Sequence, residues 1–71
     1  MRKIFLLIED LPVSDIIAVT AFDESRSMLC DGAARCCREH AIRDCLDKLA
    51  AVVELAAYEL VIEDLNPNSD P

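Results

Sequence analysis

The sequence contains few turn-forming residues and few aromatic residues for its core. It has one glycine, three prolines, two phenylalanines, one tyrosine and no tryptophan among 71 residues. The core must therefore be built from Leu, Ile, Val, Ala and Cys, which favours closely packed helices. A chain of this length holds one domain, predicted over residues 1–65, and the polar residues 66–71 are predicted to form a disordered tail.

Long apolar runs are also absent. No stretch of 18 uncharged residues occurs, which excludes a helix that spans a membrane. The apolar run that follows Arg2 and Lys3 comprises residues 4–8 only, whereas a secretory signal needs about 7 to 15 apolar residues. We therefore expect a cytoplasmic protein.

Basic residues are scarce. Seven Lys and Arg residues face 14 Asp and Glu residues, the net charge is -7, and no base follows Lys48. Phosphate contacts need clustered Lys and Arg, so direct nucleic-acid binding is excluded, and an anionic membrane would repel the chain. A cationic protein surface is the easier partner. The charge leaves one alternative function open, an acidic mimic of nucleic acid that blocks a DNA-binding protein.

Three segments organise the predicted fold. They are an extended arm over residues 1–12, a first helix over 14–31 and a second helix over 33–64. Ser14 is a favourable N-cap, Asp15 complements the helix dipole, and the second helix has no internal Gly or Pro. The hinge falls at Gly32, a natural C-cap, or near His40. The sequence thus predicts a mainly all-α fold, a helical hairpin with a short N-terminal extended segment.

Residues 16–22 allow a second interpretation. They read Ile-Ile-Ala-Val-Thr-Ala-Phe, which is rich in strand-forming residues, and residues 3–8 are typical of a short buried strand. If the two segments pair as a hairpin, the protein is ββα. The absence of alternation and the cap at Ser14 favour the helix.

The second predicted helix carries a surplus of apolar residues. Beside its main stripe runs a second line with alternating four- and three-residue spacing. This line comprises Ala51, Leu55, Tyr58, Ile62 and Leu65. The first helix can cover only one face, so the second line needs the N-terminal run, a second copy or a different protein. We predict an interaction face here and favour a homodimeric four-helix arrangement.

Four cysteines, Cys30, Cys36, Cys37 and Cys45, lie close together in the sequence. Without an export signal they are expected to be reduced and packed in the core. Together with His40 they leave open a metal- or redox-responsive module, although their spacing does not match a structural zinc site. We predict no metal, no cofactor and no small-molecule substrate. No oxyanion hole or Gly-rich turn accompanies the cysteines, so we predict no catalytic residue and no enzyme activity.

Positive charge gathers in the middle of the chain at Arg35, Arg38 and Arg43. Helix ion pairs such as Asp44 with Lys48 would account for a solvated face. The arginines could instead flank a protein-binding surface, where Arg is enriched. We therefore treat the three arginines as candidate partner contacts.

The sequence resembles small helical-hairpin proteins of pseudomonads and their phages. The resemblance lies in the order of three segments: an apolar N-terminal run, then LPVSDIIAVTAF, then LDKLAAVVELAAYELV. The resemblance extends over residues 4–63, and that group is similar in size to phage-encoded anti-activators and other host-directed inhibitors. It implies binding to a host regulatory protein and carries no catalytic residues. The predicted function is a small acidic regulator or inhibitor, phage or mobile-element encoded, that dimerises and blocks a partner protein's functional surface.

Overall fold

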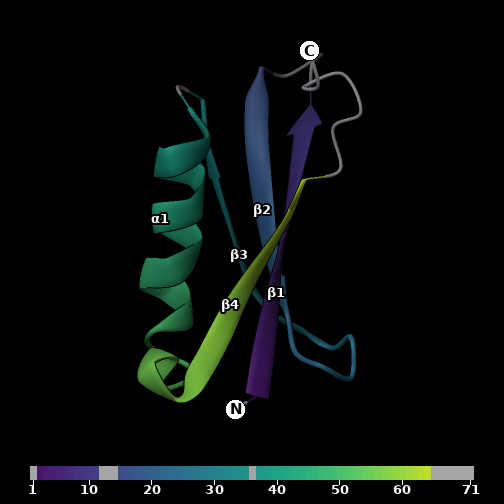
Figure 1. Ribbon diagram of the computed structural model, residues 1–71. Coiled ribbons are helices and arrows are strands. Elements are labelled where there is room, and N and C mark those ends of the chain that lie inside the picture. Colours follow the sequence, from purple (N-terminus) through teal and green to yellow (C-terminus); the bar gives the residue numbers. More distant parts are fainter. Residues whose placement is uncertain (1, 12–14, 36, 65–71) are drawn as a thin grey trace.

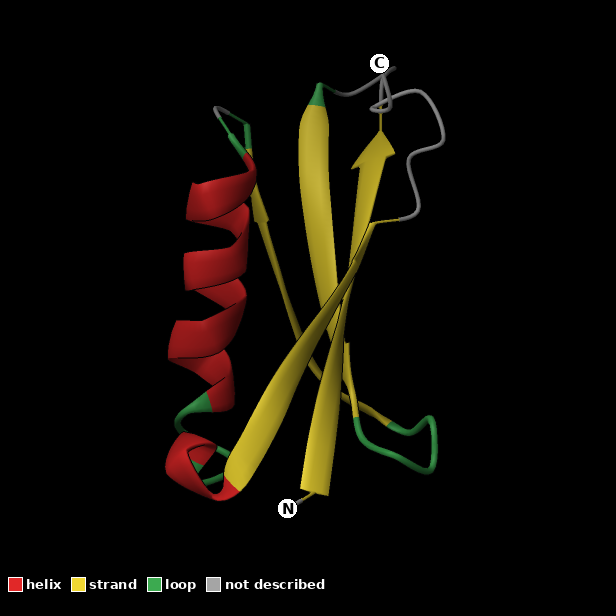
Figure 2. Cartoon of the chain, viewed as in Figure 1, coloured by secondary structure: helices red, strands yellow, loops and turns green. Residues whose placement is uncertain are grey.

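In the described part of the chain, a four-stranded sheet carries one α-helix on one of its faces (Figures 1 and 2). The computed structural model describes residues 2–11, 15–35 and 37–64. In chain order the elements are β1 (Arg2–Leu11), β2 (Ile16–Phe22), β3 (Met28–Ala34), α1 (Arg38–Leu49), a short 3₁₀ helix η1 (Leu55–Ala57) and β4 (Tyr58–Asp64).

The strands lie in the order β3-β2-β1-β4. β1 pairs with β2 and β2 with β3 in antiparallel hairpins, whereas β4 runs parallel to β1. α1 carries the chain from the β3 edge of the sheet to the β4 edge, as parallel pairing requires a crossover connection. Figure 1 shows that α1, which is the main element of this crossover, lies on one side of the sheet.

The predicted all-α hairpin is wrong, and with it the homodimeric four-helix arrangement built on that hairpin. The helix predicted over 14–31, of which residue 14 lies outside the described residues, does not form: residues 16–22 are strand β2, which pairs with β1 from Phe5↔Phe22 to Leu11↔Ile16. The ββα alternative describes this part of the chain correctly. Its strand-forming residues gain a ladder and a buried face from β1, and this tertiary gain outweighs the local cap signal.

The second predicted helix, over 33–64, is also wrong in extent. α1 spans twelve residues, Arg38–Leu49, and the chain then turns through η1 into β4. β4 pairs with β1 along its whole length, with Ile4↔Leu60 and Leu6↔Ile62 in register. Strong helix formers do not hold residues 58–64 in a helix, because β1 offers this segment a strand partner.

Gly32 is not the C-cap of a helix. It lies inside β3, opposite Val19 of β2, and its φ is not positive. A Cβ atom at Gly32 would lie 2.4 Å from the backbone nitrogen of Cys45 and 2.7 Å from its Cα. Gly32 therefore allows the backbone of α1 to approach β3 closely.

One apolar layer between α1 and the sheet forms the core. Its buried residues are Ile4, Leu6 and Ile8 of β1, Val19 and Ala21 of β2, and Ala41, Cys45 and Leu49 of α1. The strand residues are spaced by two and the helix residues by four, as expected for one face of each element. No helix of the described residues is long and apolar enough to cross a membrane. The predicted tail 66–71 and Leu65 lie outside the described residues.

Candidate protein-binding surface

α1 covers only part of the sheet face on which it lies. It packs against β3 and, to a lesser extent, β2, where Gly32 permits close contact. β4 is the strand at the opposite edge of the sheet. Figure 1 shows β4 diverging from α1 toward its C-terminal end. The layer between helix and sheet is therefore open at the β4 edge.

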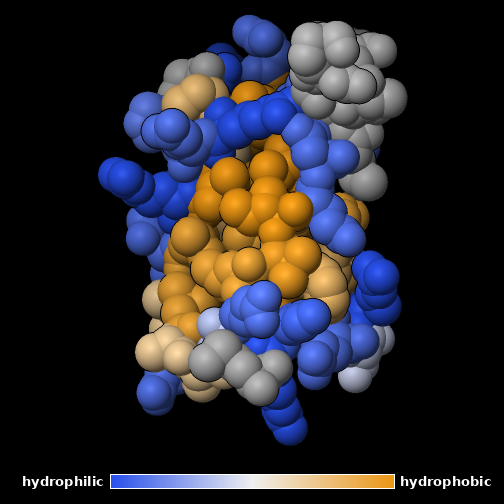
Figure 3. Space-filling model, viewed as in Figure 1, coloured by the Kyte–Doolittle hydropathy of each residue, from blue (hydrophilic) through white to orange (hydrophobic). Residues whose placement is uncertain are grey.

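β4 presents apolar side chains at this open end. Leu60 and Ile62 are in register with buried Ile4 and Leu6, so they project from the same face of the sheet as the core. Yet 38% of Leu60 and 54% of Ile62 is exposed to solvent. With Tyr58, which follows the same alternation, they form what we call the β4 apolar face. Figure 3 shows a continuous apolar area between α1 and β4, surrounded by hydrophilic residues.

The interaction face predicted from the sequence is only partly one surface. Tyr58 and Ile62 do lie together, because they are four residues apart on a strand and thus share a face. Leu55 is half-buried in η1 and packs against the core, Ala51 is exposed after α1, and Leu65 lies outside the described residues. Leu60 was missed. Tyr58, Leu60 and Ile62 alternate with Glu59 and Glu63 in the sequence, a period of two that is typical of a strand. This pattern could have placed Leu60 on the same face as Tyr58 and Ile62.

The reverse face of the sheet is also apolar but better covered. Phe5 and Phe22 lie in register on neighbouring strands, and both are half-buried. The Arg26 guanidinium stands 5.4 Å from the centre of the Phe5 ring, within the range of a cation–π contact. These two phenylalanines are thus less exposed than Leu60 and Ile62, although Met28, the β3 neighbour of Phe22, is 63% exposed.

The three candidate arginines occupy different settings. Arg38, at the start of α1, forms an ion pair with Asp64 at the end of β4 and lies 3.8 Å from the Asp10 carboxylate on β1. It therefore joins the helix to the carboxyl ends of both strands. Arg35 and Arg43 are exposed. Arg38 thus has a structural partner, and only the other two stay available as partner contacts.

The Asp44 carboxylate ties α1 to β3. It accepts a hydrogen bond from the backbone N–H of Ala33 at 3.0 Å, and the predicted ion pair with Lys48 forms at 3.4 Å. The Ala33 amide, followed by Lys48, lowers the pKa of Asp44 below its ordinary value of 3.8. A lowered pKa means that the ionised carboxylate stabilises the fold, and that this contribution disappears as pH falls below this ordinary value.

Asp44→Asn is expected to reduce the acid sensitivity of the fold. Between about pH 5 and about pH 2.5, the urea midpoint of the wild type should fall further than that of the variant, because only the wild type has this carboxylate to protonate. Glu24→Gln, in the exposed β2–β3 turn, is the control and should keep the wild-type response. Equal acid sensitivity in Asp44→Asn and wild type would contradict the role of this carboxylate.

The described cysteines are free thiols in distinct places. Cys30 of β3 and Cys45 of α1 face each other with 3.8 Å between their Sγ atoms. Cys36 lies outside the described residues, and the His40 Nδ1 lies 3.2 Å from the Sγ of Cys37. No group of three or more His, Cys, Asp or Glu residues in the described ranges could hold a metal ion.

Cys45 is expected to resist thiol reagents in the folded protein. Burial, and then the neighbouring Cys30, raise the pKa of its thiol from 9.0 to about 12. At pH 8 the reactive thiolate fraction is then about a thousandfold smaller than that of an ordinary thiol. Peptide mapping after iodoacetamide treatment should show Cys37 modified and Cys45 unmodified until denaturant is added. Equal labelling of Cys45 and Cys37 in native buffer would contradict this burial.

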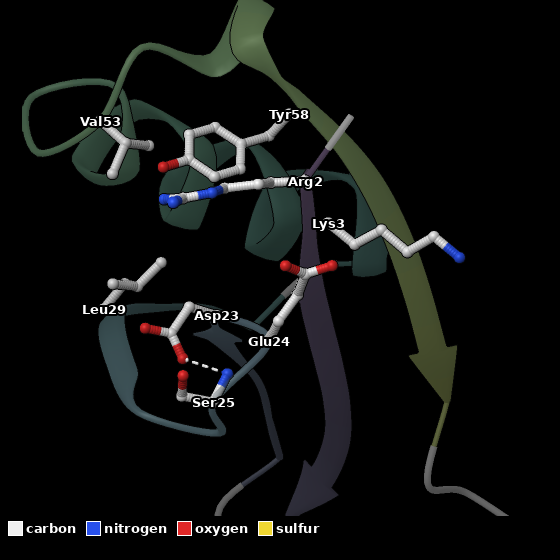
Figure 4. A pocket seen from close by; sticks show the side chains of 8 residues that line it. All are labelled: Arg2, Lys3, Asp23, Glu24, Ser25, Leu29, Val53 and Tyr58. Atoms are coloured by element: carbon white, nitrogen blue, oxygen red, sulfur yellow. Dashed lines mark hydrogen bonds between the residues drawn. The ribbon is translucent and has the colours of Figure 1, made fainter.

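A concavity lies at the N-terminal end of β1, and Tyr58 of the β4 apolar face is among its lining residues (Figure 4). Its lining residues are Arg2, Lys3, Asp23, Glu24, Ser25, Leu29, Val53 and Tyr58, and its volume is about 260 Å³. Asp23 closes the β2–β3 turn by accepting the N–H groups of Ser25 and Ser27, each at 2.9 Å. Ligand pockets usually measure about 300 to 1,000 Å³ and are mainly apolar. This small site of mixed charge is a weaker candidate than the β4 apolar face.

Comparison with protein-family models, curated proteins and solved structures gives no match for this chain. The geometry of the described residues is therefore the basis for a functional proposal. Its leading feature is an apolar strand face at an open sheet edge, which suits contact with another protein.

Proposed function

We propose that this protein is a non-enzymatic regulator or inhibitor that acts in the cytoplasm by binding a partner protein and covering part of that protein's functional surface. The observation that carries the proposal is the exposure of Leu60 and Ile62 on the same sheet face as the core. Burying such side chains against a partner stabilises a complex through the hydrophobic effect.

The charge around the β4 apolar face supports a basic partner. Glu59, Glu63 and Asp64 alternate with or follow the apolar residues of β4, and the chain has no base after Lys48. A complementary potential raises the rate of encounter and suppresses wrong partners. The proposed partner surface therefore has an apolar centre with Lys or Arg at its rim.

Photo-crosslinking followed by binding measurements tests the proposal. A photoreactive amino acid in place of Ile62, in cells that express the protein, identifies what touches the β4 apolar face. Placement at Met28, which is 63% exposed on β3, supplies the control site. The captured protein is then purified and titrated calorimetrically with wild type, Ile62→Lys and Met28→Lys.

Ile62→Lys is expected to weaken binding at least about tenfold, because it places an ammonium group in the apolar contact. Met28→Lys should bind like the wild type. Both variants should retain the wild-type urea midpoint, since both positions are exposed. If Ile62→Lys binds with wild-type affinity, or if only the Met28 site captures a partner, the proposal is wrong.

A further inference from the structure

The two edges of the sheet differ in how the described part of the chain protects them. At the β3 edge α1 lies against the strand, Gly32 admits its backbone, and the Asp44 carboxylate accepts the N–H of Ala33. At the β4 edge no described strand pairs with the outer side. An exposed edge carries unpaired N–H and C=O groups and can accept another strand. Among the described residues, β4 is therefore the edge that no α-helix packs against, whereas β3 is partly protected by α1.

The side chains of β4 specify what such an added strand would need. On the side of α1 they are the apolar residues Tyr58, Leu60 and Ile62. On the reverse side Glu59 and Glu63 flank Val61. Lys3 is the β1 neighbour of Glu59, but the β1 neighbour of Glu63 is Leu7, so the sheet itself supplies one base for two acids. A matching strand alternates apolar residues with bases.

A second copy of this chain is a poor match for the edge. If all seven β4 residues pair antiparallel with a second β4, Val61 lies on the two-fold axis. Glu59 then lies opposite the second copy's Glu63 on the same face, and this happens twice. Like charges directly opposite each other destabilise a strand pair, and each chain carries a net charge of -7. Charged residues at an edge commonly prevent self-pairing in this way.

We propose that β4 binds an extended segment of a partner protein as a fifth strand, with apolar residues on the side of α1 and Lys or Arg opposite Glu59 and Glu63. This inference rests on the proposed function and specifies how the partner is recognised. Strand addition obtains affinity from backbone hydrogen bonds and specificity from alternate side chains. The added strand would also cover Leu60 and Ile62, which α1 leaves exposed.

A synthetic peptide provides the probe. In fluorescence anisotropy, a labelled peptide Lys-Lys-Ile-Val-Val-Lys-Ile with blocked ends is compared with the peptide in which every Lys is Glu. In either orientation its second and sixth residues lie opposite Glu59 and Glu63. The Lys peptide is expected to bind at least about tenfold more tightly at low ionic strength, and the double variant Glu59→Lys/Glu63→Lys should reverse this preference. Equal binding of the two peptides would overturn the proposal.

Backbone methylation distinguishes strand addition from a simple charge contact. Alternate N–H groups of a strand point to opposite edges, so methylating the nitrogens of residues 2, 4 and 6, or those of 3, 5 and 7, blocks one edge at a time. One series should lose binding at least about tenfold and the other should retain it. In NMR spectra the bound peptide should protect backbone amides of β4 from exchange. If both series bind like the parent, or if the affected amides lie elsewhere, no strand is added.

Together, the peptide experiments and the partner-binding measurements distinguish a failure of strand addition from a failure of the proposed function. If neither methylated series loses affinity while Ile62→Lys still weakens the crosslinked partner, strand addition is wrong and protein binding through β4 stands. If Ile62→Lys leaves partner affinity unchanged, the proposed function fails first. If sedimentation shows a dimer that Val61→Lys dissociates, a second copy occupies the edge and the basic-strand proposal is overturned.

Discussion

Leu6→Ala is expected to destabilise the protein by about 3 kcal/mol, since truncation of a fully buried leucine usually costs about 2 to 5 kcal/mol. Leu6 is 0% exposed in the middle of β1, the strand that pairs with both β2 and β4. The cavity would open between α1 and the centre of the sheet. A chain of this size has little stability to spare, so the urea midpoint should fall sharply.

Two further variants make this prediction decisive. Leu11→Ala removes the same atoms at a position that is 37% exposed, and it should cost less than about 1 kcal/mol. Leu6→Met keeps the volume and should cost less than about 1.5 kcal/mol, which gives a measurable midpoint even if Leu6→Ala is unfolded. A wild-type midpoint for Leu6→Ala would contradict the single-layer core.

Gly32→Ala is expected to be the second large effect, with a loss of about 2 to 3 kcal/mol typical of overpacking. The new Cβ would lie 2.4 Å from the nitrogen of Cys45, 2.7 Å from its Cα and 2.9 Å from the carbonyl carbon of Asp44. All three are backbone atoms, so no side chain can turn away and α1 itself must shift. The displaced helix should also expose Cys45 to thiol reagents, a second readout measured by peptide mapping.

Ala33→Val is the matched control for Gly32→Ala. Ala33 is exposed on the same strand, one residue along, and its side chain points to the face opposite α1. Added bulk there should change the free energy of unfolding by no more than about 0.5 kcal/mol. If Gly32→Ala has the stability of Ala33→Val, the close approach of α1 to β3 is not a feature of the protein.

The sequence predicted some parts of this fold and not others, for identifiable reasons. The strand predicted at residues 3–8 lies within β1, since this short apolar run contains Ile and Phe and no helix-start signal precedes it. Residues 16–22 were assigned to a helix because Ser14 and Asp15 gave a local start signal. The decisive interaction was pairing of this segment with β1, and no local pattern measures it.

The candidate site shows the same division. The sequence identified a surplus of apolar residues that includes Tyr58 and Ile62. It predicted that these residues form a face that contacts another protein. Spacing of four fits one side of a helix and also one face of a strand. Leu60, two residues from each, belongs to the face only if the segment is extended. The surplus was therefore visible, but its geometry was not.

By itself the sequence determined a small acidic domain with an aliphatic core, an N-terminal strand and an apolar surplus near the C-terminus, because these follow from composition and local pattern. Only the tertiary structure decided that residues 58–64 form a strand parallel to β1 and that α1 stops short of covering it. Parallel pairing joins segments more than fifty residues apart. The free energy that selects it comes from contacts between those segments, which neither segment reveals alone.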